Sequence, residues 1–303
     1  MNLQIINFPP MRTMTKFTGT LLALLFCFTI QAQSQLLESL KMESKLLDYE
    51  VEYSIYLPPD YETSSRSYPI VYLLHGYTDD ETGWTQFGEV KRLVDEAINS
   101  GEIPPMIIAM PDGKVTWYMN DHAGTEPWED MFVQELIPHV ESEYRVRARR
   151  EFRAISGLSM GGFGSLRLSM AHPELFVACA AYSSAVWTAE EFAGFPDENY
   201  DRTFARLFGD GLKGNDRITD YWKANSVIDM VENKPENELK RVRYYFDCGD
   251  DDFLAVGNAS LHIALKQKGI PHEYRVRDGA HTWGFWRTSL PIGLKFIGES
   301  FRR

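Results

Sequence analysis

The strongest candidate for a reactive group in this sequence is a serine that lies between two glycines. Residues 156–162 read Ser-Gly-Leu-Ser-Met-Gly-Gly and contain a Gly-x-Ser-x-Gly pattern centred on Ser159. The pattern follows a short apolar run and precedes a helix-like run, which is the setting of a nucleophile on a sharp strand-to-helix turn. Gly157 and Gly161 suit such a turn because larger side chains would clash there. We therefore predict that Ser159 is a nucleophile, the alternative being a glycine-rich turn of purely structural use.

The elements that must position Ser159 follow from the spacing of apolar residues. Residues 49–57 alternate apolar and polar side chains, as a half-buried antiparallel strand does. Residues 69–74 are continuously apolar, which is typical of a strand covered on both faces, and residues 106–110 have the same character. Further strands are predicted at residues 152–156, 176–182, 242–247 and 274–276. Apolar residues at helical spacing occupy residues 90–98, 132–140, 162–171 and 259–268.

Buried strands that alternate with helices predict an α/β protein with a mostly parallel, twisted sheet and helices on both faces. The leading antiparallel strand suits a mixed sheet of the α/β-hydrolase type. Residues 187–240 break the alternation, since they contain helix-like patterns and no clear buried strand. We expect residues 33–303 to form one catalytic domain, with residues 187–240 as a small helical insertion over the carboxyl ends of the strands, above the active site.

A serine hydroxyl becomes a nucleophile only beside a base that a third group orients. In the α/β-hydrolase order the acid and then the histidine follow the serine, each in a loop after a strand. His281 has this position, after residues 274–276 and beside the small residues Gly279 and Ala280. The acid should follow residues 242–247, where Asp250, Asp251 and Asp252 are adjacent, and the pattern alone leaves all three open.

A developing oxyanion needs two oriented N–H donors. One is expected from the amide of Met160, the residue after the nucleophile, and the other from Tyr77, in the loop after residues 69–74. Gly76 lets that loop turn inward. His75 precedes it, and we interpret His75 as ordering the loop by hydrogen bonds rather than as a catalytic base.

Aromatic residues fall in or beside the predicted loops and are candidates for the walls of a cleft. Besides Tyr77, these are Trp84, Trp117, Trp187 and Trp283. A flat aryl group or a sugar ring would pack well on such side chains. The alternative for each of them is ordinary core packing.

The N-terminal residues have the pattern of a secretory signal peptide. Arg12 and Lys16 precede an apolar run at residues 21–30, and Ala32 follows it. We predict that residues 1–32 are removed by cleavage near Ala32 and that the protein is secreted or periplasmic. An uncleaved anchor is the alternative, and translation could begin at Met11 or Met14. The apolar run is short for a membrane span, so no stable membrane insertion is expected after cleavage.

Composition narrows the possible partners. The formal net charge is −12, which argues against a nucleic-acid partner because phosphate binding needs clustered Lys and Arg. The sequence contains no metal-binding motif, and neither a metal nor another cofactor is expected. Cys179 and Cys248 lie in apparent core strands and are interpreted as free, buried thiols.

Three blocks of sequence resemble a known family of hydrolases. Residues 73–77 (Leu-Leu-His-Gly-Tyr), residues 135–144 and residues 153–162 are similar to the esterase D group of α/β-hydrolases, and within it most similar to bacterial feruloyl esterases of carbohydrate esterase family 1. The resemblance extends from about Leu36 to the C-terminus. In that family the acid follows a Cys-Gly pair after two intervening residues, which implies Asp252, and the histidine has a Gly-x-His context, which matches His281.

The resemblance implies a serine carboxylesterase that acts on feruloyl or related acyl esters of plant cell-wall polysaccharide. The insertion at residues 187–240 matches no ferulate pocket residue by residue. An acetyl-xylan or other acyl-sugar esterase and a siderophore esterase are alternatives with the same triad. An S-formylglutathione hydrolase is disfavoured because its thiol substrate is cytosolic. A non-catalytic carbohydrate-binding protein on a hydrolase scaffold is the hypothesis from a different class.

Overall fold

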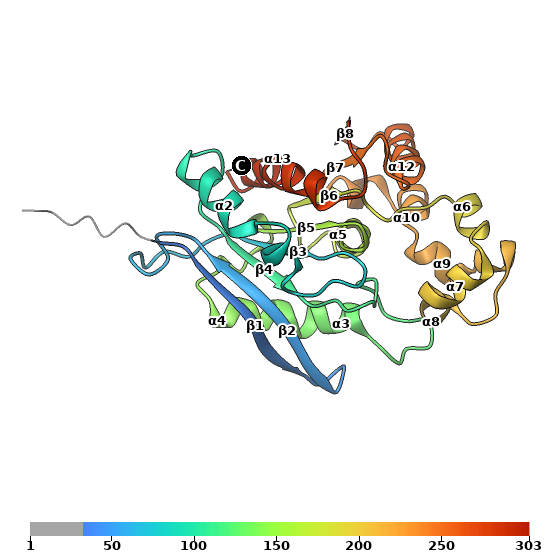
Figure 1. Ribbon diagram of the computed structural model, residues 1–303, viewed down its shortest axis with the longest axis horizontal. Helices are drawn as coiled ribbons and strands as arrows, with labels where there is room; N and C mark the ends of the chain where they lie inside the picture. The colour runs from blue at the N-terminus through green and yellow to red at the C-terminus, as the bar shows by residue number, and fades with distance from the viewer. Residues whose placement is uncertain (1–32, 303) are drawn as a thin grey trace, which may run out of the picture. The chain divides into compact units, whose positions relative to one another are not determined.

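The computed structural model describes residues 33–302, and its centre is one eight-stranded sheet (Figure 1). The strands are β1 (Gln35–Ser44), β2 (Tyr49–Leu57), β3 (Ile70–Leu74), β4 (Ile107–Pro111), β5 (Arg153–Leu158), β6 (Ala178–Tyr182), β7 (Arg243–Gly249) and β8 (His272–Arg277). Their order in the sheet is β1-β2-β4-β3-β5-β6-β7-β8. The β1–β2 and β2–β4 pairs are antiparallel and the other pairs are parallel. The predicted mixed, mostly parallel sheet of the α/β-hydrolase fold is confirmed.

Helices cover both faces of the sheet. They are α1 (Gly83–Gln86), α2 (Val90–Asn99), α3 (Trp128–Met131), α4 (Ile137–Glu143), α5 (Met160–Ala171), α6 (Ala189–Ala193), α7 (Asp197–Thr203), α8 (Ala205–Phe208), α9 (Asp220–Asn225), α10 (Val227–Asn233), α11 (Glu236–Leu239), α12 (Ala255–Gln267) and α13 (Trp283–Ser300). Helices α2 and α13 pack on one face, and α3, α4, α5, α10 and α12 pack on the other. A π-helical turn (Phe132–Leu136) joins α3 to α4.

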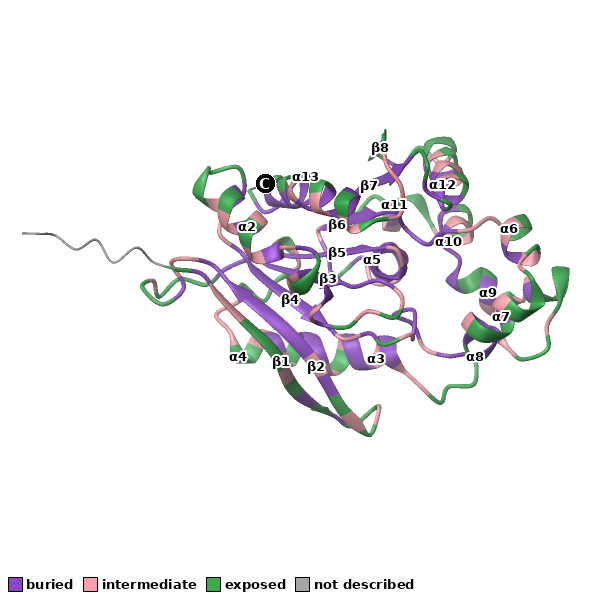
Figure 2. Cartoon of the chain, in the orientation of Figure 1, coloured by how far each residue is buried: buried purple, intermediate pink, exposed green. Residues whose placement is uncertain are grey.

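Central strands can be continuously apolar because their side chains contribute to the hydrophobic cores on both faces of the sheet. In β3, Ile70 and Tyr72 belong to the core under α3 and α5, while Val71 and Leu73 belong to the core under α2 and α13. Successive side chains point to opposite faces of a sheet, so a strand covered on both sides, such as β3, can be apolar at every position. Figure 2 accordingly shows the central strands as buried and much of β1 as exposed.

Strand β1 was not predicted. Its side chains are mostly exposed or half-buried, and its pairing with β2 shifts register between Leu37 and Leu40. Ser39 lies in this shift with a left-handed φ of 52°, so the alternation of apolar and polar residues that marks a strand is interrupted.

Other sequence-based expectations have mixed outcomes. Cys179 and Cys248 are free and buried, as predicted, and burial raises the pKa of each thiol to about 12.

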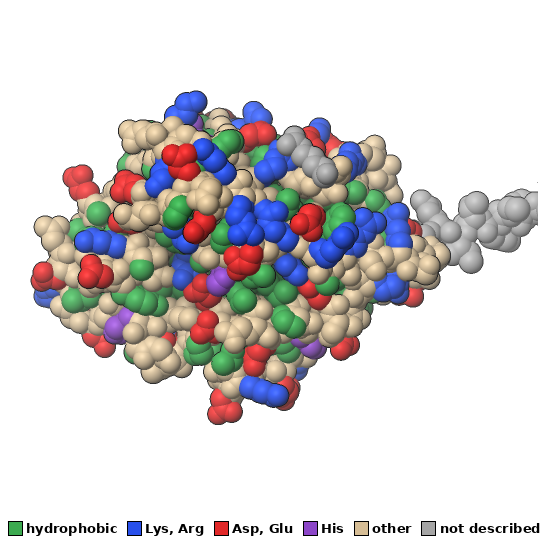
Figure 3. Space-filling model, turned by 180° about the vertical axis from the view of Figure 1, so that it is seen from behind, with side chains coloured by type: hydrophobic (Ala, Val, Ile, Leu, Met, Phe, Trp, Pro, Cys, Tyr) green, Lys and Arg blue, Asp and Glu red, His purple; other side chains and the backbone are tan. Residues whose placement is uncertain are grey.

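No helix within residues 33–302 combines the length and the apolar character needed to cross a membrane. The predicted signal peptide, residues 1–32, lies outside the described residues. Acidic and basic side chains lie beside one another across the face seen in Figure 3, and the expectation of no nucleic-acid partner stays a prediction.

The interrupting segment, residues 187–240, folds into α6 to α11 and one short 3-10 turn (Gly214–Arg217). Its interior is a cluster of packed rings in which Phe192 and Phe204 have centroids 5.1 Å apart, and Phe192 and Trp222 also 5.1 Å apart. Trp187 packs on Phe204 with centroids 5.3 Å apart. These aromatic residues are continuous with the core on the α5 face of the sheet.

A buried polar cluster connects α5 to both α3 and the 187–240 segment. Arg167 of α5 donates to Glu129 of α3 over 2.6 Å and to Asn225 of α9 over 2.7 Å. His172 lies 2.8 Å from the second oxygen of Glu129. Burial alone would raise the pKa of the Glu129 carboxyl, but the hydrogen bonds and charges of His172 and Arg167 outweigh it and hold the pKa at about 2.

This cluster should make stability depend on pH in the acid range. A carboxyl whose pKa is lower in the folded chain stabilises it above the ordinary pKa, near 4.5, and loses that contribution as pH falls towards about 2. The contribution at neutral pH is on the order of 3 kcal/mol. Because Gln mimics a protonated carboxyl, Glu129→Gln should lower the free energy of unfolding in urea at pH 6 by about this amount, with a smaller difference from wild type at pH 3. Glu299→Gln, at an exposed position of α13, is the control; a Glu129→Gln deficit that is constant with pH would contradict the assignment.

Candidate active site

Ser159 occupies the turn between β5 and α5. Its φ and ψ are 53° and −115°, a conformation that non-glycine residues rarely adopt and that surrounding structure must enforce. Its amide donates to the Tyr182 carbonyl of β6 over 2.9 Å. A Cβ on Gly161 would lie 2.5 Å from the carbonyl oxygens of Leu74 and His75, and one on Gly157 would lie 2.5 Å from the Gly161 oxygen. Glycine is required at both positions by close backbone approach, which matches the reasoning from the sequence.

Asp252 and His281 reach Ser159 from the loops that follow β7 and β8, the last two strands of the chain. His281 lies between β8 and α13, and Asp252 lies between β7 and α12. The Ser159 Oγ lies 2.9 Å from His281 Nε2, and His281 Nδ1 lies 2.8 Å from Asp252 Oδ2. Ionised Asp252 accepts a hydrogen bond from the Nδ1–H group of His281, which leaves Nε2 unprotonated and able to accept the serine proton. The arrangement can remove a proton from the serine hydroxyl and hold the resulting imidazolium.

Asp252 is built to remain charged. Its side chain is 4% exposed, and its second oxygen accepts from the Leu254 amide over 2.9 Å. Burial raises the pKa of this carboxyl, but the hydrogen bonds from His281 and the Leu254 amide outweigh burial, and the net pKa lies below the ordinary value. The carboxylate form is therefore the one that faces the imidazole.

The two neighbouring carboxylates face elsewhere. Asp250 accepts from the Gly279 amide over 3.0 Å and so holds the loop that carries His281, while Asp251 is exposed. Together with Asp278 they form one group of carboxylates whose oxygens lie within 4.8 Å of one another. All three are exposed, and none is among the described residues lining the hollows beside Ser159. The expectation that the chemistry needs no metal stays a prediction.

The two expected oxyanion donors lie beside the serine. Met160 begins α5, where the first amide of a helix has no intrahelical acceptor. Tyr77 follows β3 in a loop that packs tightly on the Ser159 turn, because a Cβ on Gly76 would lie 2.7 Å from the Leu158 side chain and 3.8 Å from the Ser159 Cβ. Within residues 33–302 neither amide has a hydrogen-bond acceptor. Their catalytic role remains a prediction.

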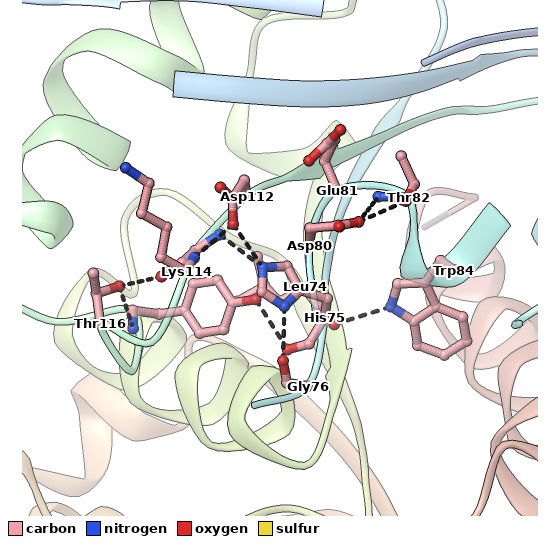
Figure 4. A network of polar contacts seen from close by, with 12 residues as sticks. Leu74, His75, Gly76, Asp80, Glu81, Thr82, Trp84, Asp112, Lys114 and Thr116 are labelled. Atoms are coloured by element: carbon pink, nitrogen blue, oxygen red, sulfur yellow. Dashed lines mark hydrogen bonds and ion pairs between the residues drawn. The ribbon is translucent and has the colours of Figure 1, made fainter. Parts of the chain in front are cut away.

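His75 contacts the loop after β3, and Figure 4 shows its imidazole beside Gly76. Its Nδ1 lies 2.8 Å from the Gly76 carbonyl oxygen, and its Nε2 lies 2.8 Å from the Gly113 amide nitrogen. The first contact requires a donor and the second an acceptor, so His75 is the neutral tautomer protonated on Nδ1. The predicted role of His75 in ordering this loop is confirmed.

The predicted substrate-contacting aromatic residues separate into two groups. Trp117 and Trp187 line one hollow beside Ser159, and Trp283 lines another. Trp84 lines neither: it is 1% exposed, and its indole donates to the Leu74 carbonyl over 3.0 Å (Figure 4). The prediction for Trp84 was wrong, because this indole supports the loop after β3 from within the core.

The first hollow, here the aromatic hollow, has a volume of about 320 Å³. Its walls include Ser159 and six rings, those of Tyr77, Trp117, Trp187, Phe195, Phe204 and Phe253. Phe195, Phe204 and Phe253 were missed by the sequence reasoning. Phe253 follows the acid directly, is 72% exposed and packs 4.7 Å from the His281 ring, so adjacency to Asp252 was the signal that could have found it.

The fold and the arrangement of Ser159, His281 and Asp252 define an α/β-hydrolase with a serine–histidine–aspartate site. Residues 44–297 match the family described as "Putative esterase", and the chain belongs to that esterase family. It is a carboxylic ester hydrolase.

Named relatives point to two kinds of ester. An acetyl esterase of Caldicellulosiruptor saccharolyticus is 28% identical over 78% of this chain and 86% of the relative. An endo-1,4-beta-xylanase/feruloyl esterase of Xylanibacter ruminicola is 30% identical over 78% of this chain, but the match spans only 28% of that longer protein. Among solved structures, a ferulic acid esterase aligns with a TM-score of 0.75 and 31% identity over 89% of this chain and 99% of the other. The resemblance to feruloyl esterases is confirmed.

Single substitutions should distinguish Asp252, as the triad acid, from the neighbouring aspartates. An Asn at position 252 would donate its amide to Nδ1 and place the imidazole proton on Nε2, facing the serine. Asp252→Asn should therefore lower kcat by about 10³- to 10⁴-fold for a p-nitrophenyl ester, with the fold retained by circular dichroism. Asp251→Asn removes the same charge from an exposed neighbour and should change kcat by less than about threefold. A Asp252→Asn enzyme that keeps a tenth of the wild-type rate would exclude this assignment.

Proposed function

We propose that this esterase is an exported enzyme that uses Ser159, His281 and Asp252 to hydrolyse feruloyl or related aryl-acyl esters on plant cell-wall polysaccharide. The observation that carries the proposal is the position of Ser159 at the edge of the aromatic hollow, where a flat acyl group would be surrounded by ring surfaces. The similarity to a ferulic acid esterase over 89% of the chain supports the same substrate class.

The reaction proceeds in two halves. As Ser159 Oγ attacks the ester carbon, its proton passes to His281 Nε2, and the amides of Tyr77 and Met160 receive the oxyanion. Collapse of the tetrahedral species breaks the bond from carbon to the alcohol oxygen, which takes the proton from Nε2. Water then attacks the acyl-enzyme, giving its proton to His281, and a second collapse frees the acid and returns the proton to Ser159.

An acetyl esterase is the second candidate, favoured by the acetyl esterase relative. An acetyl group would occupy a small part of a hollow of about 320 Å³ and would leave most of the ring surfaces in contact with water. Burial of an aryl ring there gains on the order of 2 kcal/mol over a methyl group. The geometry therefore favours the larger acyl group.

Comparison of three substrates tests the acyl group and the nucleophile together. We expect kcat/KM for methyl ferulate to exceed that for an acetylated xylo-oligosaccharide by at least about tenfold, in line with the buried ring. Ser159→Ala should abolish both activities. Turnover by Ser159→Ala at the wild-type rate would contradict the assignment of Ser159 as the nucleophile. A preference for the acetyl ester would instead support the second candidate, an acetyl esterase. A short aryl ester such as p-nitrophenyl acetate reports whether the triad works when neither natural substrate is accepted.

Export rests on the sequence of residues 1–32. N-terminal sequencing of protein recovered from the periplasm or medium of the producing bacterium should give Gln33 as the first residue, because cleavage is expected after Ala32. Recovery of an exported chain that still begins at Met1, Met11 or Met14 would refute cleavage.

A further inference from the structure

A buried ion pair lies at the foot of the two loops that carry the acid and the base, and the proposed reaction does not use it. Asp247 belongs to β7 and Arg277 ends β8, and Nη2 of Arg277 donates to Asp247 Oδ2 over 2.9 Å. The Asp247 side chain is 0% exposed, and the Tyr245 hydroxyl donates to the same oxygen over 3.0 Å. The loop of Asp252 follows β7, and the loop of His281 follows β8. The pair therefore joins the two strand ends that present the acid and the base.

The two loops are also bonded directly to each other. The Asp250 amide donates to the Arg277 carbonyl over 3.0 Å, and the Gly279 amide donates to the Asp250 carboxylate over 3.0 Å. The backbones lie so close that a Cβ on Gly249 would be 2.1 Å from the Gly279 carbonyl oxygen. Because these contacts bind the loop after β8 to the loop after β7, the end of β8 sets where the base stands relative to the acid.

Arg277 also closes the base of the His281 loop. Beyond that loop the chain enters α13, and the Arg277 guanidinium reaches this helix by donating to Thr288 Oγ1 over 3.1 Å and to Ser289 Oγ over 2.5 Å. The same group lies over the Phe285 ring, 4.4 Å from its centroid. One side chain thus holds together the strand before His281 and the helix after it.

The pair is poorly suited to a role in stability alone. Within residues 33–302, Asp247 Oδ1 and Arg277 Nε are buried without a hydrogen-bond partner. Burial raises the pKa of the Asp247 carboxyl, although the charge of Arg277 and the hydrogen bonds from Ser289, Arg277 and Tyr245 oppose it. A buried ion pair gains little over apolar side chains of similar volume, and unpartnered polar atoms add a further cost. Stability therefore does not account for the pair, and its location at the foot of both loops points to a role in their placement.

We propose that Arg277, held by Asp247, is a positioning residue that fixes His281 within the triad. The inference rests on the triad of the proposed function. The guanidinium acts through the imidazole, since neither Arg277 nor Asp247 is among the described residues that line the two hollows beside Ser159. Loss of the pair should therefore slow the chemical step and leave substrate binding unchanged. A displacement of about 1 Å at reacting groups can cost about 10²-fold in rate.

The test replaces the ion pair by two neutral side chains. Asp247→Asn combined with Arg277→Gln leaves no unpaired charge in the core, so this double variant should fold, whereas Arg277→Gln alone leaves the Asp247 charge buried. A Gln amide cannot make the three side-chain hydrogen bonds of the guanidinium. With a p-nitrophenyl ester we therefore expect kcat of the double variant to fall about 10- to 100-fold, while KM changes less than about threefold. Arg275→Gln is the control, because Arg275 lies on the same strand in an exposed ion pair with Glu273, and it should keep the wild-type kcat.

Three further measurements distinguish positioning from a loss of fold. Circular dichroism and thermal unfolding give the folded fraction of each variant, to which kcat is referred. Arg277→Lys keeps the charge beside Asp247 and should retain more of kcat than the double variant. The downfield 1H NMR resonance of the hydrogen bond between His281 Nδ1 and Asp252 should be sharp in wild type and broadened in the double variant.

Wild-type kcat in the folded double variant, an unchanged Nδ1 resonance, or a rise in KM at constant kcat would overturn the inference. Failure of the triad itself has a different signature. Asp252→Asn would then keep its activity in a protein whose Asp247–Arg277 pair is intact.

Discussion

The close approach of three backbone segments at Ser159 is the constraint on which the site depends. Gly161 lies against the carbonyls that end β3, and Gly157 lies against Gly161 itself. This contact forces Ser159 into a left-handed conformation and at the same time brings the loop of Tyr77 alongside it. One packing contact therefore raises the nucleophile and positions a candidate oxyanion donor, so neither can shift without the other.

Polar contacts away from the serine keep that contact rigid. His75 ties the Tyr77 loop to the segment after β4 through Gly113 (Figure 4). On the other side of the serine, Arg167 and Glu129 hold α5, the helix that begins just after Ser159, to α3. Buried polar groups of this kind fix one arrangement because any other leaves a charge or a donor without a partner. The reacting groups need such support, since small displacements at a triad cost large factors in rate.

The sequence predicted the parts of the molecule that are governed by local rules. Apolar runs identified the central strands because both faces of the sheet are covered, and the order of loops after strands identified Ser159 and His281 as groups that would meet. The choice among Asp250, Asp251 and Asp252 came only from family resemblance. It depends on how the turn after β7 directs each carboxylate, which no single-residue pattern encodes. Strand β1 was not predicted because an exposed edge strand with a bulge lacks regular alternation of apolar and polar residues. The prediction for Trp84 was wrong because a residue beside a loop can still point into the core.

The walls of the two hollows show how one sheet can present two chemistries beside a single serine. The aromatic hollow takes Trp187, Phe195 and Phe204 from the 187–240 segment, and these rings pack on one another. The second hollow, which Trp283 and His281 line, takes Tyr77, Thr78 and Asp79 from the short loop after β3. The two walls are not independent, because Tyr77 and Phe253 line both hollows. The serine and the sheet serve both hollows, and substrate choice is then a property of the loops rather than of the fold.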